Sequence, residues 1–139
     1  MTLDLHAELL QRDVVCTPLD TTAARAFAQR WSSTFAPSPP PQPCPYRWHT
    51  FSFQLYQCLE GAAALSAYLD QWYAPFYVFD EALDFCALCE AQAYPDLSAL
   101  RRDIYVAHQN LKWTVAFTHE QPHLGPFFAE RFVNSSEIN

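Results

Sequence analysis

A run of prolines constrains the fold of this chain more than any other feature. The stretch PSPPPQPCP, from Pro37 to Pro45, contains six prolines in nine residues. Because proline lacks a backbone N–H and has a fixed φ, the stretch must be extended and cannot enter the interior of a sheet. A P-x-x-P segment could dock on an aromatic groove, but a stiff surface connector explains it better. We therefore expect one domain over residues 1–139, with the connector 37–45 inside it.

Three segments have the apolar spacing or the composition of helices. Leu3–Gln11 is a short amphipathic segment, and Cys58–Tyr73 is helical by propensity, with Gly61 near its first turn. The third segment, residues 22–35, can be capped by Asp20 or Thr21. Its apolar residues recur at intervals of three and four and should face the core: Ala24, Phe27, Ala28, Trp31 and Phe35.

Segments rich in β-branched and aromatic residues predict the strands. They lie within Asp13–Pro18 and at Arg47–Phe53, Phe76–Phe79, Phe85–Cys89, 103–107 and 112–118, the last two forming a hairpin. A short helix is expected at Asp96–Arg102 and a helical turn at Gly125–Phe132. Because strict βαβ spacing is absent, we expect an α+β fold: a mostly antiparallel sheet of about five strands with helices packed on one side.

The stretch His119-Glu120-Gln121-Pro122-His123 matches H-E-x-x-H, the signature of zinc metalloproteases. In those enzymes a helix brings both histidines to one metal. Pro122 lacks an N–H and disfavours helical dihedrals at Gln121, and Gly125-Pro126 breaks the chain again. We therefore expect an irregular loop after a strand, with no metal and no cofactor.

Cys86-x-x-Cys89 is the other short motif with a chemical meaning. A redox pair needs a stabilised thiolate, whereas the neighbouring Asp84 and Glu90 would raise a thiol pKa. Structural zinc needs a second ligand pair, which the sequence does not offer. The cysteines number five, and the N-terminus has no export signal. We expect buried, reduced thiols in a cytoplasmic protein, although redox activity of the pair stays open.

The acidity of the chain is concentrated in its middle. The formal net charge is −7, and no basic residue lies between Arg47 and Arg101. This balance argues against nucleic-acid binding, which needs clustered Lys and Arg, and no apolar run is long enough to span a membrane. A localised acidic surface can steer a basic protein partner. The partner-binding residues expected are Glu60, Asp70, Trp72, Tyr73, Asp80, Glu81, Asp84, Glu90, Tyr94 and Asp96.

Two alternatives to a binding protein stay open. A small enzyme could use a histidine–carboxylate site near His49, His119 and Glu120, which requires these side chains to converge. A structural homo-oligomer could instead bury the surplus of aromatic residues in a self-interface. The sequence does not decide between monomer and homodimer.

Several short motifs together resemble a bacterial family of small uncharacterised domains. They follow in order as RW with Phe35 (Arg30-Trp31), WHTFSF (Trp48–Phe53), CLEGAAA (Cys58–Ala64), YVF (Tyr77–Phe79), DIYV (Asp103–Val106), WT (Trp113-Thr114), THE (Thr118–Glu120) and GPFF (Gly125–Phe128). The resemblance covers most of the chain and departs from the family at the proline run. It carries no catalytic residue with it, and it implies a recurrent strand end and turn at THE…GPFF.

Acidic bacterial domains of this size without a catalytic motif often act by binding. One such role is that of an immunity protein, which neutralises a cognate toxin domain. The role requires a rigid scaffold, exposed aromatic anchors and charge opposite to that of the target. By this analogy we expect a non-enzymatic protein that binds a basic toxin or effector domain.

Overall fold

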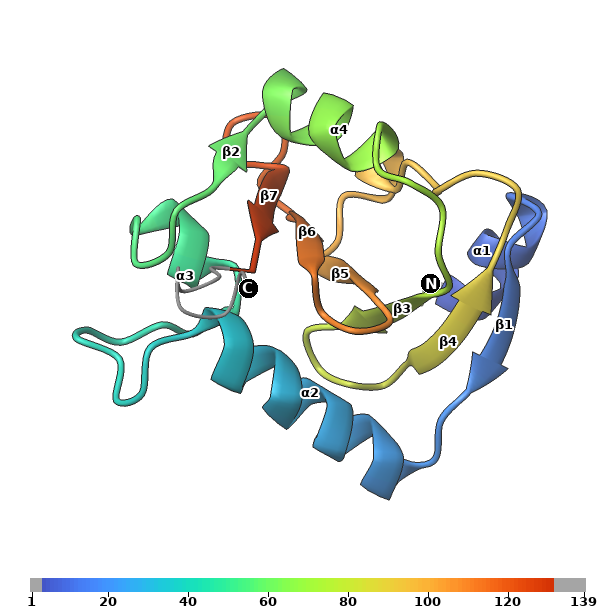
Figure 1. The fold of residues 1–139 in the computed structure, drawn as a ribbon, viewed down its shortest axis with the longest axis horizontal. Helices are drawn as coiled ribbons and strands as arrows, with labels where there is room; N and C mark the ends of the chain where they lie inside the picture. Colours follow the sequence, from blue (N-terminus) through green and yellow to red (C-terminus); the bar gives the residue numbers. More distant parts are fainter. Residues whose placement is uncertain (1–3, 132–139) are drawn as a thin grey trace, which may run out of the picture.

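A computed structural model describes residues 4–131 (Figure 1). Leu3, which begins the first predicted helix, and Phe132, which ends the predicted C-terminal turn, lie outside the described residues. The helices are α1 (Leu5–Gln11), α2 (Thr21–Phe35), α3 (His49–Ser52), α4 (Ala62–Leu69) and the 3₁₀ helix η1 (Ser98–Leu100). The strands are β1 (Val15–Pro18), β2 (Leu59–Glu60), β3 (Phe76–Asp80), β4 (Cys86–Glu90), β5 (Ile104–His108), β6 (Trp113–Phe117) and β7 (Phe127–Glu130).

Within residues 4–131 these strands form one sheet in the order β1-β4-β3-β5-β6-β7-β2. All six pairings are antiparallel. The predicted α+β class and the mostly antiparallel sheet are therefore confirmed. The sheet has seven strands, however, where the sequence predicted about five.

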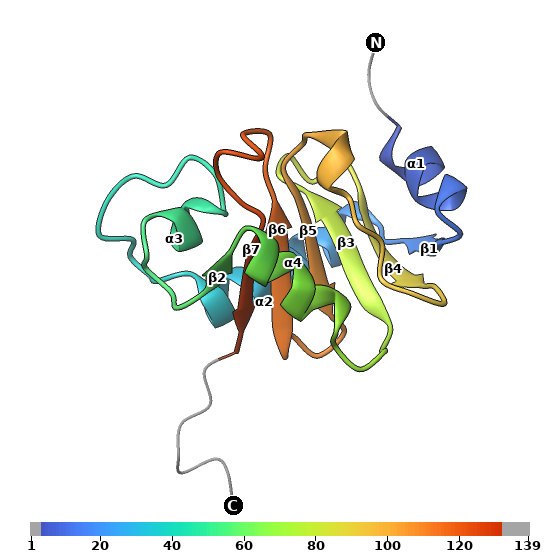
Figure 2. The ribbon, with the colours of Figure 1, turned by 90° about the horizontal axis from the view of Figure 1, so that it is seen from above.

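The helices cover both faces of the sheet, so the prediction that they pack on one side is wrong. Figures 1 and 2 show α4 over one face and α2 against the other. Side chains from α1 and α4 share one apolar cluster, and those from α2 and α3 share a second. The central strands require this cover because they bury residues on both faces: in β3, Val78 enters the first cluster and Phe79 the second.

Helix α2 begins and packs as its sequence predicts. Asp20 is its N-cap, and the carboxylate accepts a hydrogen bond from the Ala23 amide at 2.8 Å. All five residues of the predicted stripe are buried. Trp31 lies at the centre of this face, where its ring meets those of Phe79 and Tyr105 edge-on. Aromatic packing of this kind fixes α2 on the sheet.

The segment predicted as a strand at Arg47–Phe53 instead contains helix α3. Trp48 and Phe51 are both buried in the cluster beneath α2, while Phe53 is exposed. A separation of three residues places Trp48 and Phe51 on one face of a helical turn, whereas a strand would turn them to opposite faces. The alternation of aromatic residues suggested a period of two, whereas the buried residues follow the helical period.

The tail predicted as a helical turn from Gly125 forms strand β7 instead. β7 pairs with β6, placing Phe128 opposite Val115, and on its other side with the two-residue strand β2. Gly125 begins this segment at a φ of +91°, in a region that favours glycine. A β-carbon there would lie 3.1 Å from the Thr118 side chain, so a larger residue would also be crowded.

The proline-rich connector runs outside the sheet, as predicted. Residues 37–45 contain neither helix nor strand and join α2 to α3. Among the helices of residues 4–131, none has the length and apolar character that crossing a bilayer demands.

Candidate functional site

The predicted acidic residues do not form one surface. Asp80, Glu81 and Asp84 lie in or beside the turn between β3 and β4, at one end of these strands. Trp72, Tyr73 and Glu90 lie at the other end, where β3 begins and β4 ends. Asp70, at the C-terminus of α4, is exposed two residues before Trp72, whereas Glu60 in β2 and Asp96 before η1 are exposed elsewhere.

Glu81 is held by a basic residue that the charge pattern placed outside the acidic segment. Arg47 Nη1 donates to the Glu81 carboxylate at 2.7 Å and to its main-chain oxygen at 2.6 Å. The Arg47 amide donates to the other carboxylate oxygen at 2.9 Å, and so does the Tyr105 hydroxyl. Burial raises the pKa of Tyr105 well above its ordinary value, and the Glu81 charge raises it further. Glu81 therefore joins the start of α3 to the sheet.

Asp80 is also structural. It exposes only 3% of its surface, and one carboxylate oxygen accepts from the Phe85 amide at 3.1 Å. The other oxygen lies 3.5 Å from Arg102 Nη2. Asp80 thus closes the β3–β4 turn and is neutralised by a neighbouring cation, so only Asp84 of the three turn acids is exposed.

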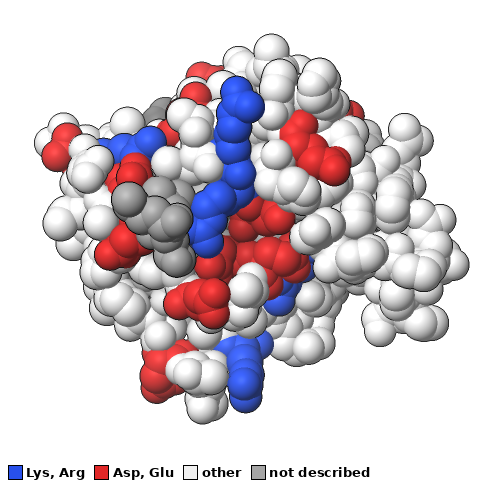
Figure 3. All heavy atoms as spheres, turned by 180° about the vertical axis from the view of Figure 1, so that it is seen from behind, with Lys and Arg blue, Asp and Glu red and all other residues white. Residues whose placement is uncertain are grey.

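The surface behind the view of Figure 1 carries charges of both signs. Acidic side chains gather near the centre of that face, and Lys or Arg side chains lie among them (Figure 3). The ion pairs made by the acids of the β3–β4 turn are Arg47–Glu81 and Arg102–Asp80. Because each arginine offsets the charge of its carboxylate, this region attracts a basic partner only weakly.

The three aromatic residues predicted as anchors are neighbours in the fold but differ in exposure. Trp72 exposes 95% of its surface and Tyr73 exposes 47%, while Tyr94 is buried. The Tyr94 hydroxyl accepts from the Ala74 amide at 2.9 Å and donates to the Trp72 carbonyl at 2.8 Å. The Tyr73 hydroxyl accepts from the Ala91 amide at 2.9 Å. Tyr94 is therefore a support for the anchors and cannot itself be one.

We call the exposed group Leu69, Asp70, Trp72, Tyr73 and Glu90 the Trp72 patch. Leu69, which the sequence reasoning missed, exposes its side chain at the end of α4 beside Asp70. Glu90 is exposed next to Ala91, whose amide meets the Tyr73 hydroxyl. The patch therefore combines apolar side chains with two carboxylates, and no salt bridge of Asp70 or Glu90 is found within residues 4–131.

His119 is oriented by a carboxylate that the sequence reasoning did not single out. Asp103 accepts from His119 Nδ1 at 2.8 Å, from the His119 amide at 3.0 Å and from Trp48 Nε1 at 2.9 Å. The Glu120 carboxylate lies 3.8 Å from His119 Nε2. The Tyr46 ring is near both His49 and His119, with centroids 5.3 and 5.2 Å away. His49 and His119 thus both lie beside the Tyr46 ring, and Glu120 lies beside His119.

The hydroxyl that precedes His119 in the chain is engaged in the turn and is not free to act as a nucleophile. A histidine paired with a carboxylate can act as a base when a nucleophile lies within its reach. The nearby Thr118 hydroxyl donates to the Leu124 carbonyl and accepts from the Glu120 amide. It is thereby committed to shaping the turn. The pair is best explained as a clamp that joins the 118–124 loop to the start of β5 and to Trp48.

The H-E-x-x-H match lies in that loop and not on a helix, as the proline predicted. Residues 119–124 are turns, and the His123 amide donates to the Glu120 carbonyl at 3.0 Å. Within residues 4–131, no group of three or more His, Cys, Asp or Glu side chains is arranged to hold a metal ion.

The two cysteines of Cys86-x-x-Cys89 face opposite sides of the sheet. Residues separated by three in a strand point to opposite faces, and Cys86 lies in the cluster beneath α2 while Cys89 lies beneath α1 and α4. Burial raises the pKa of Cys86 to about 11, and the nearby Asp80 raises it as well. Burial also strongly raises the pKa of Cys89, whose sulfur lies 3.5 Å from that of Cys16. The pair therefore cannot share one disulfide or one metal.

Comparison with known proteins places the chain in an uncharacterised family. The model described as "Domain of unknown function (DUF4275)" matches residues 40–128, from the connector to β7. No curated protein and no solved structure matches the chain. The match agrees with the resemblance to an uncharacterised domain family and supplies no activity.

Proposed function

The chain belongs to the DUF4275 family of domains of unknown function, and we propose that it is a non-enzymatic binding protein that uses the Trp72 patch to hold a basic protein partner. The partner is a toxin or effector domain, which the protein neutralises as an immunity protein does. The observation that carries the proposal is Trp72, a large aromatic side chain exposed over 95% of its surface. Contiguous exposed apolar groups rimmed by polar residues mark interaction sites.

The backbone beneath Trp72 is fixed before any partner arrives. Its carbonyl accepts from the buried Tyr94 hydroxyl, which also holds the Ala74 amide, and the Gln71 amide donates to the Tyr68 carbonyl. Tyr68 is itself fully buried. A preorganised anchor loses little conformational entropy on binding, and tryptophan is the residue type most enriched at binding hot spots. The geometry therefore suits a side chain that enters a pocket on another protein.

The charge of the patch selects the partner. Asp70 and Glu90 are exposed on either side of the anchors in the chain, and the protein as a whole carries −7. A rim of one sign steers a partner of the opposite sign and makes association depend on salt. Because Asp80 and Glu81 are paired within the fold, Asp70 and Glu90 carry this role in their place.

The test is a pull-down from native cells at low salt with the tagged protein and three variants. Trp72→Ala removes the anchor, and Asp70→Lys with Glu90→Lys reverses the rim. Phe53→Ala, at an exposed aromatic residue after α3, is the matched control. We expect one stoichiometric basic protein that is retained by wild type and by Phe53→Ala, lost with Trp72→Ala and released by salt. Folding of each variant is checked by circular dichroism.

Other outcomes separate the alternatives. A partner that binds equally well to Trp72→Ala would refute the patch. Recovery of untagged copies of the same chain, with a mass that rises with concentration, would favour the homo-oligomer. If the partner loses its toxicity to cells only when the wild-type protein is co-expressed, the immunity role gains direct support. A partner whose toxicity is unchanged would leave a binding protein with another role.

A further inference from the structure

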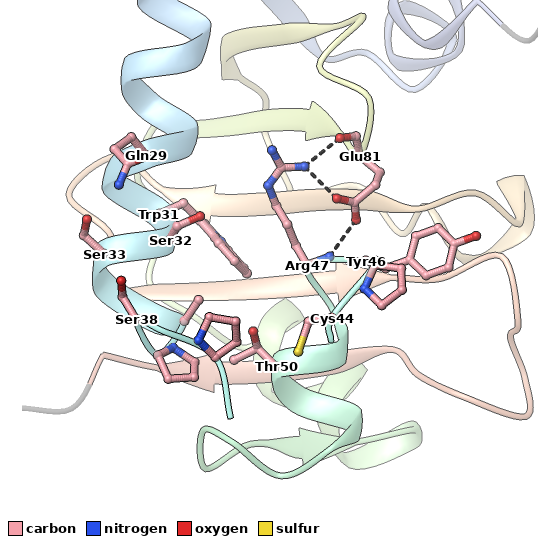
Figure 4. Close-up of a pocket in the computed structure, with 14 residues that line it drawn as sticks. Gln29, Trp31, Ser32, Ser33, Ser38, Cys44, Tyr46, Arg47, Thr50 and Glu81 are labelled. Carbon is pink, nitrogen blue, oxygen red and sulfur yellow. Dashed lines mark hydrogen bonds and ion pairs between the residues drawn. The ribbon is translucent and has the colours of Figure 1, made fainter. Parts of the chain in front are cut away.

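A pocket of about 420 Å³ lies beside the C-terminal half of α2 (Figure 4). The C-terminal half of α2, the connector and the start of α3 enclose it. Its size falls within the range of small-molecule sites, about 300–1,000 Å³. The proline-rich connector thus forms one wall of a half-open pocket that reaches the buried Trp31 of the cluster beneath α2, in addition to linking two helices.

Thr50 offers this pocket an unused hydroxyl. It exposes only 3% of its surface and lines the pocket, and Figure 4 shows its oxygen turned into the space. Its amide and carbonyl are used within α3 and the following turn. The hydroxyl itself has no hydrogen-bond partner among residues 4–131. The hydroxyl opens onto the pocket, so it can donate a hydrogen bond to a group that enters there.

Arg47 offers the second polar contact. Its Nη1 is occupied by Glu81, and its guanidinium lies over the Phe79 ring at 5.5 Å. Within residues 4–131, Nε and Nη2 have no hydrogen-bond partner, and Figure 4 shows this edge turned towards α2 and the pocket. The Nε–Nη2 edge of a guanidinium presents two parallel N–H groups, the geometry that binds a carboxylate through both oxygens.

The charge of Glu81 decides which anion fits. Glu81 cancels much of the Arg47 charge, so the pocket tolerates one further negative charge but repels a dianion such as a phosphate monoester. Ser32 and Gln29 of α2 add neutral hydrogen-bonding groups to the lining, and Pro37 and Pro45 add apolar wall. This combination suits an organic molecule with one carboxylate and a small apolar body.

We propose that this pocket is a binding site for a small organic monocarboxylate. The carboxylate lies along the Nε–Nη2 edge of Arg47, a second oxygen on the ligand accepts a hydrogen bond from the Thr50 hydroxyl, and the apolar body packs against the proline-rich wall. The pocket shares no lining residue with the Trp72 patch, so either proposal can fail without the other.

The experiment is a nitrogen-15 NMR titration of the full chain with benzoate, a rigid monocarboxylate. Benzamide, of nearly the same shape but neutral, is the matched ligand control, and phenyl phosphate tests the preference for a single charge. We expect saturable shifts in the millimolar range, confined to residues that line the pocket and including the Arg47 side-chain N–H. Benzamide and phenyl phosphate should bind several-fold more weakly.

Two variants make the test specific. Thr50→Val removes the hydroxyl at constant shape and should weaken the binding of 4-hydroxybenzoate, which carries a second oxygen opposite its carboxylate, roughly fivefold, and Ser32→Ala tests the α2 wall independently. Thr17→Val, on the exposed strand β1, is the control and should leave binding unchanged. Equal shifts with benzoate and benzamide, or 4-hydroxybenzoate binding that Thr50→Val leaves intact, would overturn the proposal and leave a hollow filled by water.

Discussion

Trp31 Nε1 donates a hydrogen bond to Thr114 Oγ1 at 2.9 Å, although 83 residues separate the two in the sequence. Both side chains are fully buried. The Thr114 hydroxyl in turn donates a hydrogen bond to the Val106 carbonyl at 2.9 Å. One hydroxyl in β6 therefore ties α2 to β6 and β5 inside an otherwise apolar cluster, and it gives the only ring nitrogen of Trp31 its partner.

Thr114→Val should destabilise the fold by about 1–3 kcal/mol, because it leaves the buried Trp31 N–H unpaired without changing the volume of the core. Trp31→Phe removes that N–H together with part of the ring. The loss of unfolding free energy in the double variant should be smaller than the sum of the two single losses by about 1 kcal/mol. Urea denaturation of the four proteins measures the cycle, and strict additivity would show that the hydrogen bond contributes nothing.

The acids of the β3–β4 turn should differ sharply in their effect on stability. Glu81→Ala removes the partner of Arg47 and Tyr105 and should cost about 2 kcal/mol, since both are left in a partly buried site. Asp84→Ala, on the exposed part of the turn, should stay within about 0.5 kcal/mol of wild type. Chemical denaturation compares them, and equal midpoints for the two variants would contradict the description of Glu81 as structural.

Local signals predicted several elements of the fold correctly. Asp20 caps α2 and the apolar stripe of that helix is buried, because capping and periodicity are properties of neighbouring residues. The hairpin of β5 and β6 was expected for the same reason. Strand β7 was missed because its four residues become a strand only by pairing with β6. Its neighbour β2 has two residues, too few for a periodic pattern.

The candidate surfaces were less predictable than the fold. A count of charges along the sequence cannot show that Arg47 forms an ion pair with Glu81, 34 residues away, or that Arg102 forms one with Asp80. Nor does the sequence separate Trp72, exposed, from Tyr94, buried beneath it. Both outcomes depend on tertiary contacts. The near-continuous apolar character of β5 and β6 did contain a signal for helices on both faces, because a strand covered on one side alternates with polar residues.

Tyr94→Phe should loosen the backbone beneath Trp72 while leaving the core ring in place. The variant loses the hydroxyl that joins the Ala74 amide to the Trp72 carbonyl. We expect a loss of about 1 kcal/mol in stability and roughly tenfold faster hydrogen exchange at the Ala74 amide. If exchange at Ala74 matches that of wild type, the hydroxyl does not hold the anchor. Tyr77→Phe, at a half-buried tyrosine of β3, serves as the control.

The buried thiols should resist alkylation at neutral pH. With a pKa of about 11, Cys86 is a thiolate in only about one molecule in ten thousand at pH 7. Iodoacetamide should therefore label the half-exposed Cys44 of the connector long before Cys86 or Cys89. Labelling of Cys86 should rise with pH and become complete in urea. Peptide mapping by mass spectrometry follows each site, and native Cys86 reacting as fast as Cys44 would disprove the raised pKa.

His108, at the end of β5, should make stability fall on acidification. Burial lowers its pKa below 6.5, and the positive charges of Lys112 and Arg131 lower it further. Its Nδ1 accepts from the Asn110 amide at 2.9 Å, a bond that protonation would break. The unfolded chain takes up a proton at His108 as the pH falls through 6.5, whereas the folded chain resists it until the lowered pKa is reached. The contribution of His108 is therefore fully present above pH 6.5 and is lost between 6.5 and its folded pKa. An NMR titration of the ring measures that pKa directly, and a midpoint at or above 6.5 would contradict the prediction.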